Sequence, residues 1–118
     1  RVVGDLAGVG NEEADALIAV RAYHLFPDVP ATLAEIMRVL KPGAVVGIVE
    51  VRLNQEYGHD MTSHRMGEQT VIEDMERAGF EYVGSPDILR GAGDDYTSYR
   101  AGERHMADRM LLKFRKPE

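Results

Sequence analysis

The sequence contains no cysteine. Disulfide bonds, zinc sites built on thiolates and cysteine nucleophiles are therefore excluded together. Basic residues are also few, because 14 Lys and Arg stand against 20 Asp and Glu and give a formal net charge of −6. A dedicated nucleic-acid-binding domain is normally basic, so this balance argues against nucleic acid as a partner.

Long apolar runs are missing as well. The longest run, Ala16–Val20, is far too short to cross a bilayer, and we expect no membrane partner. The chain opens with Arg1 rather than Met and shows no leader pattern, so we expect a processed chain or a fragment. We expect a cytoplasmic location because cysteine is absent, although an export signal on a missing segment would escape notice.

The residues that are present suit one small domain with one core. The chain has 118 residues, of which 44% are hydrophobic and 29% charged, an ordinary globular composition. We therefore expect residues 1–118 to form a single domain.

The clearest helix follows Asp28, which can act as its N-cap, with Pro30 in the first turn. Lys41–Gly43 should end it with a cation, a helix breaker and a turn former. The apolar residues that recur at helical spacing between these signals are Leu33, Ile36, Met37 and Leu40. Val45–Val49, apolar and mostly β-branched, then predicts a central parallel strand.

The other segments are read in the same way. Ala16–Val20 fits a strand buried on both faces, but a helix face through the same residues is equally compatible. Residues 52–67 predict a long loop. The later elements expected are a helix over Thr70–Ala78, a strand over Phe80–Val83, a long excursion over Asp87–Arg104 and a final strand over Met110–Phe114. This order predicts an α/β fold.

Two stretches carry a family resemblance. Ala14–Phe26, with its Tyr23-His24 pair, leads into Arg38–Gly43, which reads R-V-L-K-P-G. Together they resemble the second half of class I S-adenosylmethionine-dependent methyltransferases. The later motifs resemble a bacterial branch of predicted small methyltransferases and are His64–Met66, Arg77–Phe80, Asp87–Arg90, Asp94-Asp95 and Phe114–Pro117.

The resemblance implies a Rossmann-like methyltransferase sheet that is incomplete. It makes Ala16–Val20 a strand, supplies the family's third or fourth to seventh strands with two or three helices, and makes the last strand antiparallel. The glycine-rich cofactor loop that follows the family's first strand is not matched: Asp5–Gly10 has the wrong glycine spacing and no room for the following helix. We therefore expect a partial methyltransferase domain.

The resemblance also implies S-adenosylmethionine as cofactor, with Asp5, Leu6, Ala22 and Tyr23 as its contacts. Asp5 would accept a hydrogen bond from the adenine amino group; the alternative is an ordinary turn aspartate. Ala22 and Tyr23 follow the carboxyl end of a parallel strand, where open α/β sheets bind ligands. Alternatively, Tyr23 packs into the core.

His24 is the candidate catalytic base, because imidazole titrates near neutral pH and methyl transfer needs a base when the acceptor loses a proton. The alternative is a local cap. His64 and Arg65, at the same sheet edge, are candidates for binding the acceptor, with Arg65 gripping an anion or forming an ordinary salt bridge. His59, Asp60 and His64 lack a fourth ligand, and we expect no metal.

Other polar residues have weaker claims. Glu50, at the end of the central strand, either faces the cleft or meets water. Asp94, Asp95, Tyr96 and Tyr99 would form either a lid over the acceptor or a solvated loop.

Two functions remain open. The first is methyl transfer from S-adenosylmethionine to a small-molecule acceptor, with this chain as the C-terminal portion of the enzyme. The second is a non-catalytic α/β association module, a truncated or degenerate relative. Without a preceding strand, Ala16–Val20 would leave an open apolar edge through which two copies could form a homodimer.

Overall fold

The computed structural model describes residues 6, 8–91, 94, 96 and 107–118. Its elements in chain order are β1 (Ala14–Val20), the short 3-10 helix η1 (Tyr23–Leu25), α1 (Val29–Val39), β2 (Leu40–Arg52), β3 (His59–Asp60), β4 (Arg65–Met66), α2 (Glu68–Arg77), β5 (Glu81–Gly84), the 3-10 helix η2 (Asp87–Leu89) and β6 (Arg109–Arg115). This is the α/β fold that the sequence predicts.

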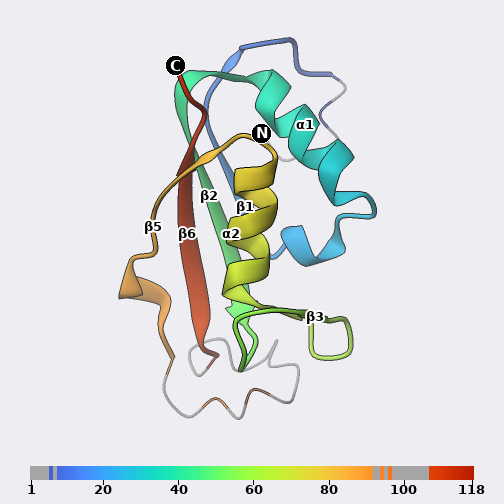
Figure 1. Ribbon diagram of the computed structural model, residues 1–118, viewed down its shortest axis with the longest axis vertical. Coiled ribbons are helices and arrows are strands. Elements are labelled where there is room, and N and C mark those ends of the chain that lie inside the picture. The colour runs from blue at the N-terminus through green and yellow to red at the C-terminus, as the bar shows by residue number, and fades with distance from the viewer. Residues whose placement is uncertain (1–5, 7, 92–93, 95, 97–106) are drawn as a thin grey trace.

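The long strand β2 organises the sheet (Figure 1). β1 pairs with it in parallel along one edge, with Ala16 opposite Val45 and Val20 opposite Val49. β6 pairs with it in antiparallel orientation along the other edge, and β5 lies outside β6. The antiparallel last strand beside the central strand is confirmed. β4 adds to the end of β2, next to β3.

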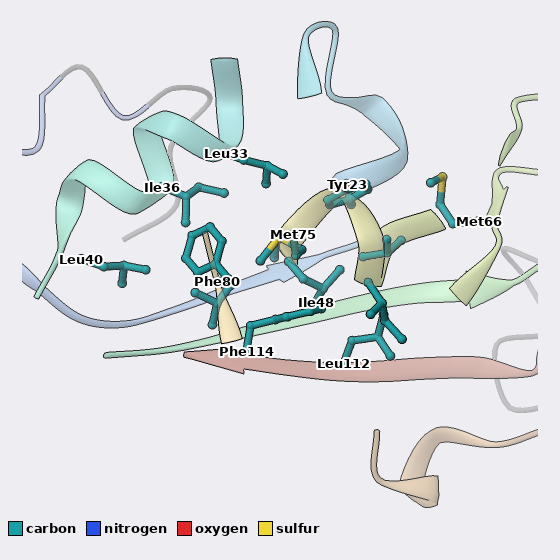
Figure 2. Close-up of a cluster of buried hydrophobic side chains, with 14 of the residues drawn as sticks. Tyr23, Leu33, Ile36, Leu40, Ile48, Met66, Met75, Phe80, Leu112 and Phe114 are labelled. Atoms are coloured by element: carbon teal, nitrogen blue, oxygen red, sulfur yellow. The ribbon is translucent and has the colours of Figure 1, made fainter. Parts of the chain in front are cut away.

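Both helices cover the same face of the sheet (Figure 2). Asp28 caps α1 by accepting a hydrogen bond from the backbone N–H of Ala31 at 3.0 Å, as expected. The buried side chains shared by the helices and this face include Leu33, Ile36, Val71, Met75, Ile48, Leu112 and Phe114. Their removal from water is the main driving force for folding.

The opposite face of β1 is open in the described part of the chain. The side chain of Ile18 is 66% exposed and that of Val20 is 58% exposed. The expectation that Ala16–Val20 is buried on both faces is therefore wrong. Both described α-helices pack on the other face, and β1 has β2 as its neighbour on one side.

The start of β2 also differs from the expectation. α1 ends at Val39, as the Lys41–Gly43 signal predicts, but β2 begins at Leu40 and contains Lys41–Gly43, whereas the strand was expected to begin only at Val45. The pairing with β1 shifts there, because Ala14 lies opposite Leu40 whereas Ala16 lies opposite Val45. A glycine serves this bulge well, since Gly43 has φ of +83°.

Residues 52–67 are more ordered than the predicted loop, because they contain β3 and β4. Short strands of two residues have no periodicity, so sequence patterns cannot reveal them. Among the described residues, no helix is long and apolar enough to span a bilayer.

Candidate active site

The candidate site lies where β1 and β2 end. The two strands are parallel, so their carboxyl ends meet at one edge of the sheet. Arg21 follows β1 directly, with φ of +56°, and its N–H donates to the carbonyl of Val49 at 2.8 Å. This left-handed turn leads the chain into η1, which places His24 above Glu50 of β2.

Glu50 holds His24 at two points. The Oε1 atom of Glu50 lies 2.8 Å from Nδ1 of His24, and its Oε2 atom accepts from the backbone N–H of His24 at 3.3 Å. A carboxylate can only accept, so Nδ1 carries the proton and donates it to Glu50. In the neutral imidazole, Nε2 then has the free lone pair, which is the arrangement of a general base oriented by a carboxylate.

Arg21 balances the charge of Glu50. The Glu50 side chain is fully buried, and Nη1 of Arg21 donates to its Oε1 at 3.0 Å. The same Nη1 also donates to the carbonyl of His64 at 2.9 Å. A buried carboxylate is tolerated only when it is paired and hydrogen-bonded, and Glu50 meets both conditions.

Two further imidazoles surround His24. The ring of His64 lies 5.3 Å from that of His24 between centroids, and the ring of His59 lies 6.4 Å away, both edge to face. The expected neighbourhood of His64 and His24 is therefore present. Within the part of the chain that the structure describes, no group of three or more His, Cys, Asp or Glu has the arrangement of a metal site.

Tyr23 packs into the core rather than facing the edge of the sheet. Its side chain is buried against Phe26, at 5.1 Å between ring centroids, and its hydroxyl donates to Oδ2 of Asp74 at 2.9 Å. Burial, together with the charge of Asp74, raises the pKa of the Tyr23 hydroxyl far above its ordinary value. Tyr23 thus ties η1 to α2 and stays protonated.

The other predicted cofactor contacts are not brought together. Ala22 lies at the edge, directly before η1, and is partly exposed. The carbonyl of Leu6 accepts a hydrogen bond from Arg38 in the last turn of α1. This contact lies next to the start of β2, whereas the candidate site lies at the other end of that strand. Asp5 lies outside the described residues.

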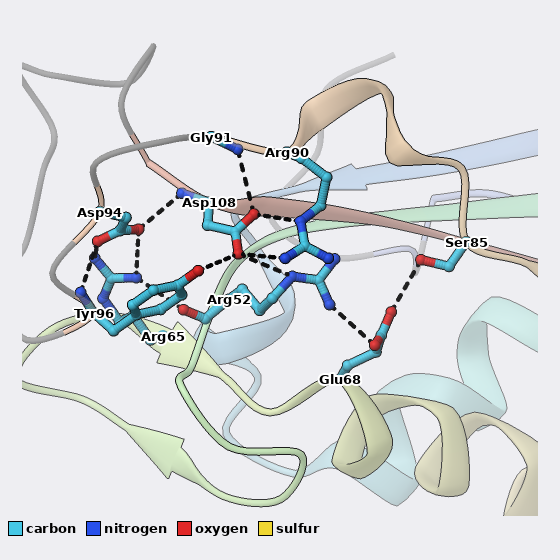
Figure 3. A network of polar contacts seen from close by, with 9 residues as sticks. All are labelled: Arg52, Arg65, Glu68, Ser85, Arg90, Gly91, Asp94, Tyr96 and Asp108. Carbon is cyan, nitrogen blue, oxygen red and sulfur yellow. Dashed lines mark hydrogen bonds and ion pairs between the residues drawn. The ribbon is translucent and has the colours of Figure 1, made fainter.

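Arg65 is committed to a buried ion pair (Figure 3). Its two terminal nitrogens donate to the two carboxylate oxygens of Asp94 at 2.9 and 2.6 Å, and both side chains are fully buried. Burial alone would raise the pKa of Asp94, but hydrogen bonds from Arg65 and from the backbone of Asp108 and Tyr96 outweigh it and lower that pKa to about 2. In this arrangement Arg65 grips Asp94 and does not face an acceptor.

A second buried aspartate completes this network. Asp108 accepts from Arg90, from the hydroxyl of Tyr96 at 2.6 Å and from the backbone N–H of Gly91, and it lies 3.5 Å from Arg52. Its own backbone N–H donates to Asp94 at 2.8 Å. Asp94 and Tyr96, expected in a lid or a solvated loop, are instead anchored to the start of β6.

Sequence patterns undervalue two residues of this site. Glu50 is a single acid at the end of an apolar strand, and Arg21 is a single cation directly after another. A charge in that position belongs either to the surface or to a buried pair, and the sequence alone cannot distinguish the two. The signal that could have revealed the pair is an acidic residue and a basic residue, Glu50 and Arg21, at the ends of two strands that are predicted to be parallel and adjacent.

Comparison with known proteins identifies the architecture. Residues 2–48 match the family described as methyltransferase domain. The chain superposes with a TM-score of 0.70 on the protein bound to the methyltransferase activator Trm112 of Haloferax volcanii, at 21% identity, covering 99% of this chain and 61% of that one. The chain has the class I methyltransferase fold.

Two further relatives set limits on what the methyltransferase fold implies. A phthiotriol/phenolphthiotriol dimycocerosates methyltransferase of Mycobacterium leprae is 38% identical over 48 residues, which are 41% of this chain and 18% of the relative. The [4+2]-cyclase SpnF superposes with a TM-score of 0.64 at 23% identity, covering 92% of this chain and 51% of its own. The chain thus spans about half of such folds, and the fold alone does not fix the reaction.

The described residues fit one side of a methyltransferase site. The edge formed by Ala22, His24 and Glu50 offers an imidazole held by a carboxylate, with Ala22 partly exposed and the side chains of His24 and Glu50 buried. The hydroxyl of Tyr23 donates to Asp74 and the carbonyl of Leu6 accepts from Arg38, so neither group lies at this edge.

Proposed function

We propose that the protein transfers a methyl group from S-adenosylmethionine to a small-molecule acceptor that carries a removable proton. The observation that supports this most directly is the buried pair of His24 and Glu50 at the carboxyl ends of two parallel strands. The match of residues 2–48 to the methyltransferase domain family supports the choice of cofactor. The absence of cysteine supports a cytoplasmic reaction.

The cofactor supplies an electrophilic methyl group on a sulfonium centre. The chain's own part is to position the acceptor and to take its proton. Nε2 of His24 accepts the proton, and Glu50 stabilises the imidazolium that results, because its carboxylate already binds Nδ1. Arg21 pairs with Oε1 of Glu50 and holds the carboxylate in place. Positioning provides much of the remaining rate enhancement.

The acceptor's chemistry follows from this base. A nucleophile that is already anionic needs no general base, so His24 favours a hydroxyl or another protonated group. His64, whose ring lies beside His24, is the candidate contact for that acceptor. Arg65 is not offered in this role, because Asp94 occupies its guanidinium.

Calorimetric titration of S-adenosylhomocysteine tests the proposal in two samples, this chain and the longest natural chain that contains it. Binding by the longer sample, or by both, supports methyl transfer. Binding by this chain without the rest of the longer one would mean that Asp5 and Ala22–His24 suffice for the cofactor. Absence of binding by both samples would refute the enzymatic function.

The open face of β1 favours a second candidate, an association module. Ile18 and Val20 are exposed apolar residues on a strand whose outer edge has no partner among the described residues. Such an edge can pair with another chain, so a homodimer through β1 is the corresponding assembly. The titration separates the two functions, because an association module would not bind S-adenosylhomocysteine.

A further inference from the structure

The ion pair between Arg65 and Asp94 is connected to the candidate base through the backbone. Arg65 is held at three points, by both oxygens of Asp94 and by the carbonyl of Arg52, to which Nη1 donates at 2.8 Å (Figure 3). The ring of Tyr96 lies 5.6 Å from the guanidinium carbon. Bidentate, charge-assisted pairs of this kind fix geometry as well as supplying energy.

The residue before Arg65 reaches the active site. His64 has φ of +55°, a left-handed conformation that costs free energy for a residue other than glycine. In this conformation its carbonyl accepts from Arg21 and its ring lies edge to face with that of His24. A strained residue persists only where its surroundings hold it, and the immediate neighbour of His64 is the anchored Arg65.

Arg21 passes this restraint to the catalytic pair. It too has a left-handed backbone, with φ of +56°, and its Nη1 is shared between the carbonyl of His64 and Oε1 of Glu50. Displacement of His64 would remove one of the two acceptors that orient this guanidinium. Glu50 would then lose a fixed cation on the oxygen that also binds His24.

We propose that Asp94 is a positioning residue for His24 and acts through Arg65, His64 and Arg21. The contacts of Asp94 described above are with Arg65, Tyr96 and Asp108, and not with His24 or Glu50. Its carboxylate holds Arg65, Arg65 keeps the strained His64 in place, and His64 with Arg21 fixes Glu50 against Nδ1 of His24. Asp94 thereby sets how rigidly the base is held. This inference depends on the proposed function only in assigning His24 the role of base.

A simpler role for Asp94 is to fasten its own segment to the start of β6, since it also accepts from the backbone N–H of Asp108. The two roles differ in one observable. If Asp94 is only a local anchor, its replacement leaves the hydrogen bond between His24 and Glu50 as rigid as in the wild type. If Asp94 is a positioning residue, its replacement loosens that bond. Exchange of the His24 Nδ1 proton with water, followed by nuclear magnetic resonance, reports on that bond directly.

The experiment compares Asp94→Asn with the wild-type protein at its full natural length, with Glu68→Gln as the matched control. Glu68 is another acid of the same network, but it pairs with Arg52 and Ser85, on the far side of Asp108 from Arg65 (Figure 3). We expect Asp94→Asn to accelerate exchange of the His24 Nδ1 proton by about tenfold, because one charge-assisted bond in the series is weakened. Glu68→Gln should leave that exchange rate unchanged.

Asp94→Glu keeps the charge and serves as the conservative variant, which should retain slow exchange in large part. If Asp94→Asn does not fold, Arg65→Lys replaces it, because a lysine cannot make the two parallel bonds to Asp94 and should likewise accelerate the exchange. An unchanged exchange rate in Asp94→Asn would overturn the proposal. Equal acceleration in Asp94→Asn and Glu68→Gln would overturn it as well. The measurement needs neither cofactor nor acceptor, so a failure to bind S-adenosylhomocysteine, which would refute the enzymatic function, leaves this result readable.

Discussion

The Nδ1 atom of His24 lies 2.8 Å from Oε1 of a fully buried Glu50, 26 residues further along the chain. This contact joins the segment after β1 to the end of β2 and fixes which nitrogen of the imidazole carries the proton. It is the part of the structure from which the functional predictions follow.

Replacement of Glu50 tests the energetic weight of this contact. Glu50→Gln should lower the free energy of unfolding by about 3 kcal/mol, because the partly buried Arg21 loses its counter-ion and the buried His24 loses a charged acceptor. Urea denaturation measures the change. The matched control is Glu81→Gln, which breaks the half-exposed pair with Arg115 and should cost about 1 kcal/mol or less. Equal losses in the two variants would contradict the assigned role of Glu50.

Replacement of His24 tests its chemistry. For an acceptor that loses a proton, His24→Asn should slow methyl transfer by about 100-fold, the ordinary contribution of a general base. Affinity for S-adenosylhomocysteine should stay unchanged, because His24 takes a proton from the acceptor and is not proposed to hold the cofactor. Single-turnover rates and calorimetry provide the two readings. A loss of affinity with an unchanged rate would reassign His24 to the cofactor.

Tyr23 is expected to contribute stability rather than catalysis. Tyr23→Phe should cost about 1 kcal/mol, because the hydroxyl donates to Asp74 from a buried position. Tyr82→Phe, at a partly exposed ring, is the comparison and should cost less. Because burial and Asp74 raise the pKa of Tyr23, its ring should ionise later than exposed tyrosines in an alkaline spectroscopic titration, and the Phe variant should lack that late step.

Asp94 should make stability depend on pH in strongly acidic solution. Its pKa falls from 3.8 to about 2 on folding, so its contribution is fully present above pH 3.8 and is lost as the pH drops toward 2. The loss amounts to about 2 kcal/mol across this window. Unfolding by urea at a series of pH values should show a flatter dependence there for Asp94→Asn. An identical slope in variant and wild type would disprove the assignment.

The open face of β1 should govern self-association. Ile18→Lys and Val20→Lys should shift the chain toward monomer in sedimentation experiments, with little loss of stability, because both side chains are exposed. Leu112→Ala, on the covered face, provides the contrast and should lower the free energy of unfolding by about 3 kcal/mol. A wild-type chain that is already monomeric would rule out the homodimer.

Local signals in the sequence predicted much of the fold. The capped helix after Asp28 and the apolar Val45–Val49 follow from patterns spanning a few residues, and both are present. The resemblance to class I methyltransferases supplied the strand assignment of Ala16–Val20 and the antiparallel final strand. The lysine-proline-glycine sequence was correctly expected to end α1. That it also lies within β2 was missed, because the pairing with β1 that accommodates its bulge is a tertiary contact.

The sequence by itself determined the α/β class of the fold and the helix and central strand that follow Asp28, because apolar periodicity and caps act over neighbouring residues. The resemblance to class I methyltransferases made Ala16–Val20 a strand, and His24, just past the end of that strand, was then predicted as the base. Only the tertiary structure decided the partners. Glu50 binds His24, Asp94 takes Arg65 away from any acceptor, and Tyr23 turns into the core toward Asp74. These contacts join residues tens of positions apart, and they depend on strand register and on the exclusion of water, which no local pattern records.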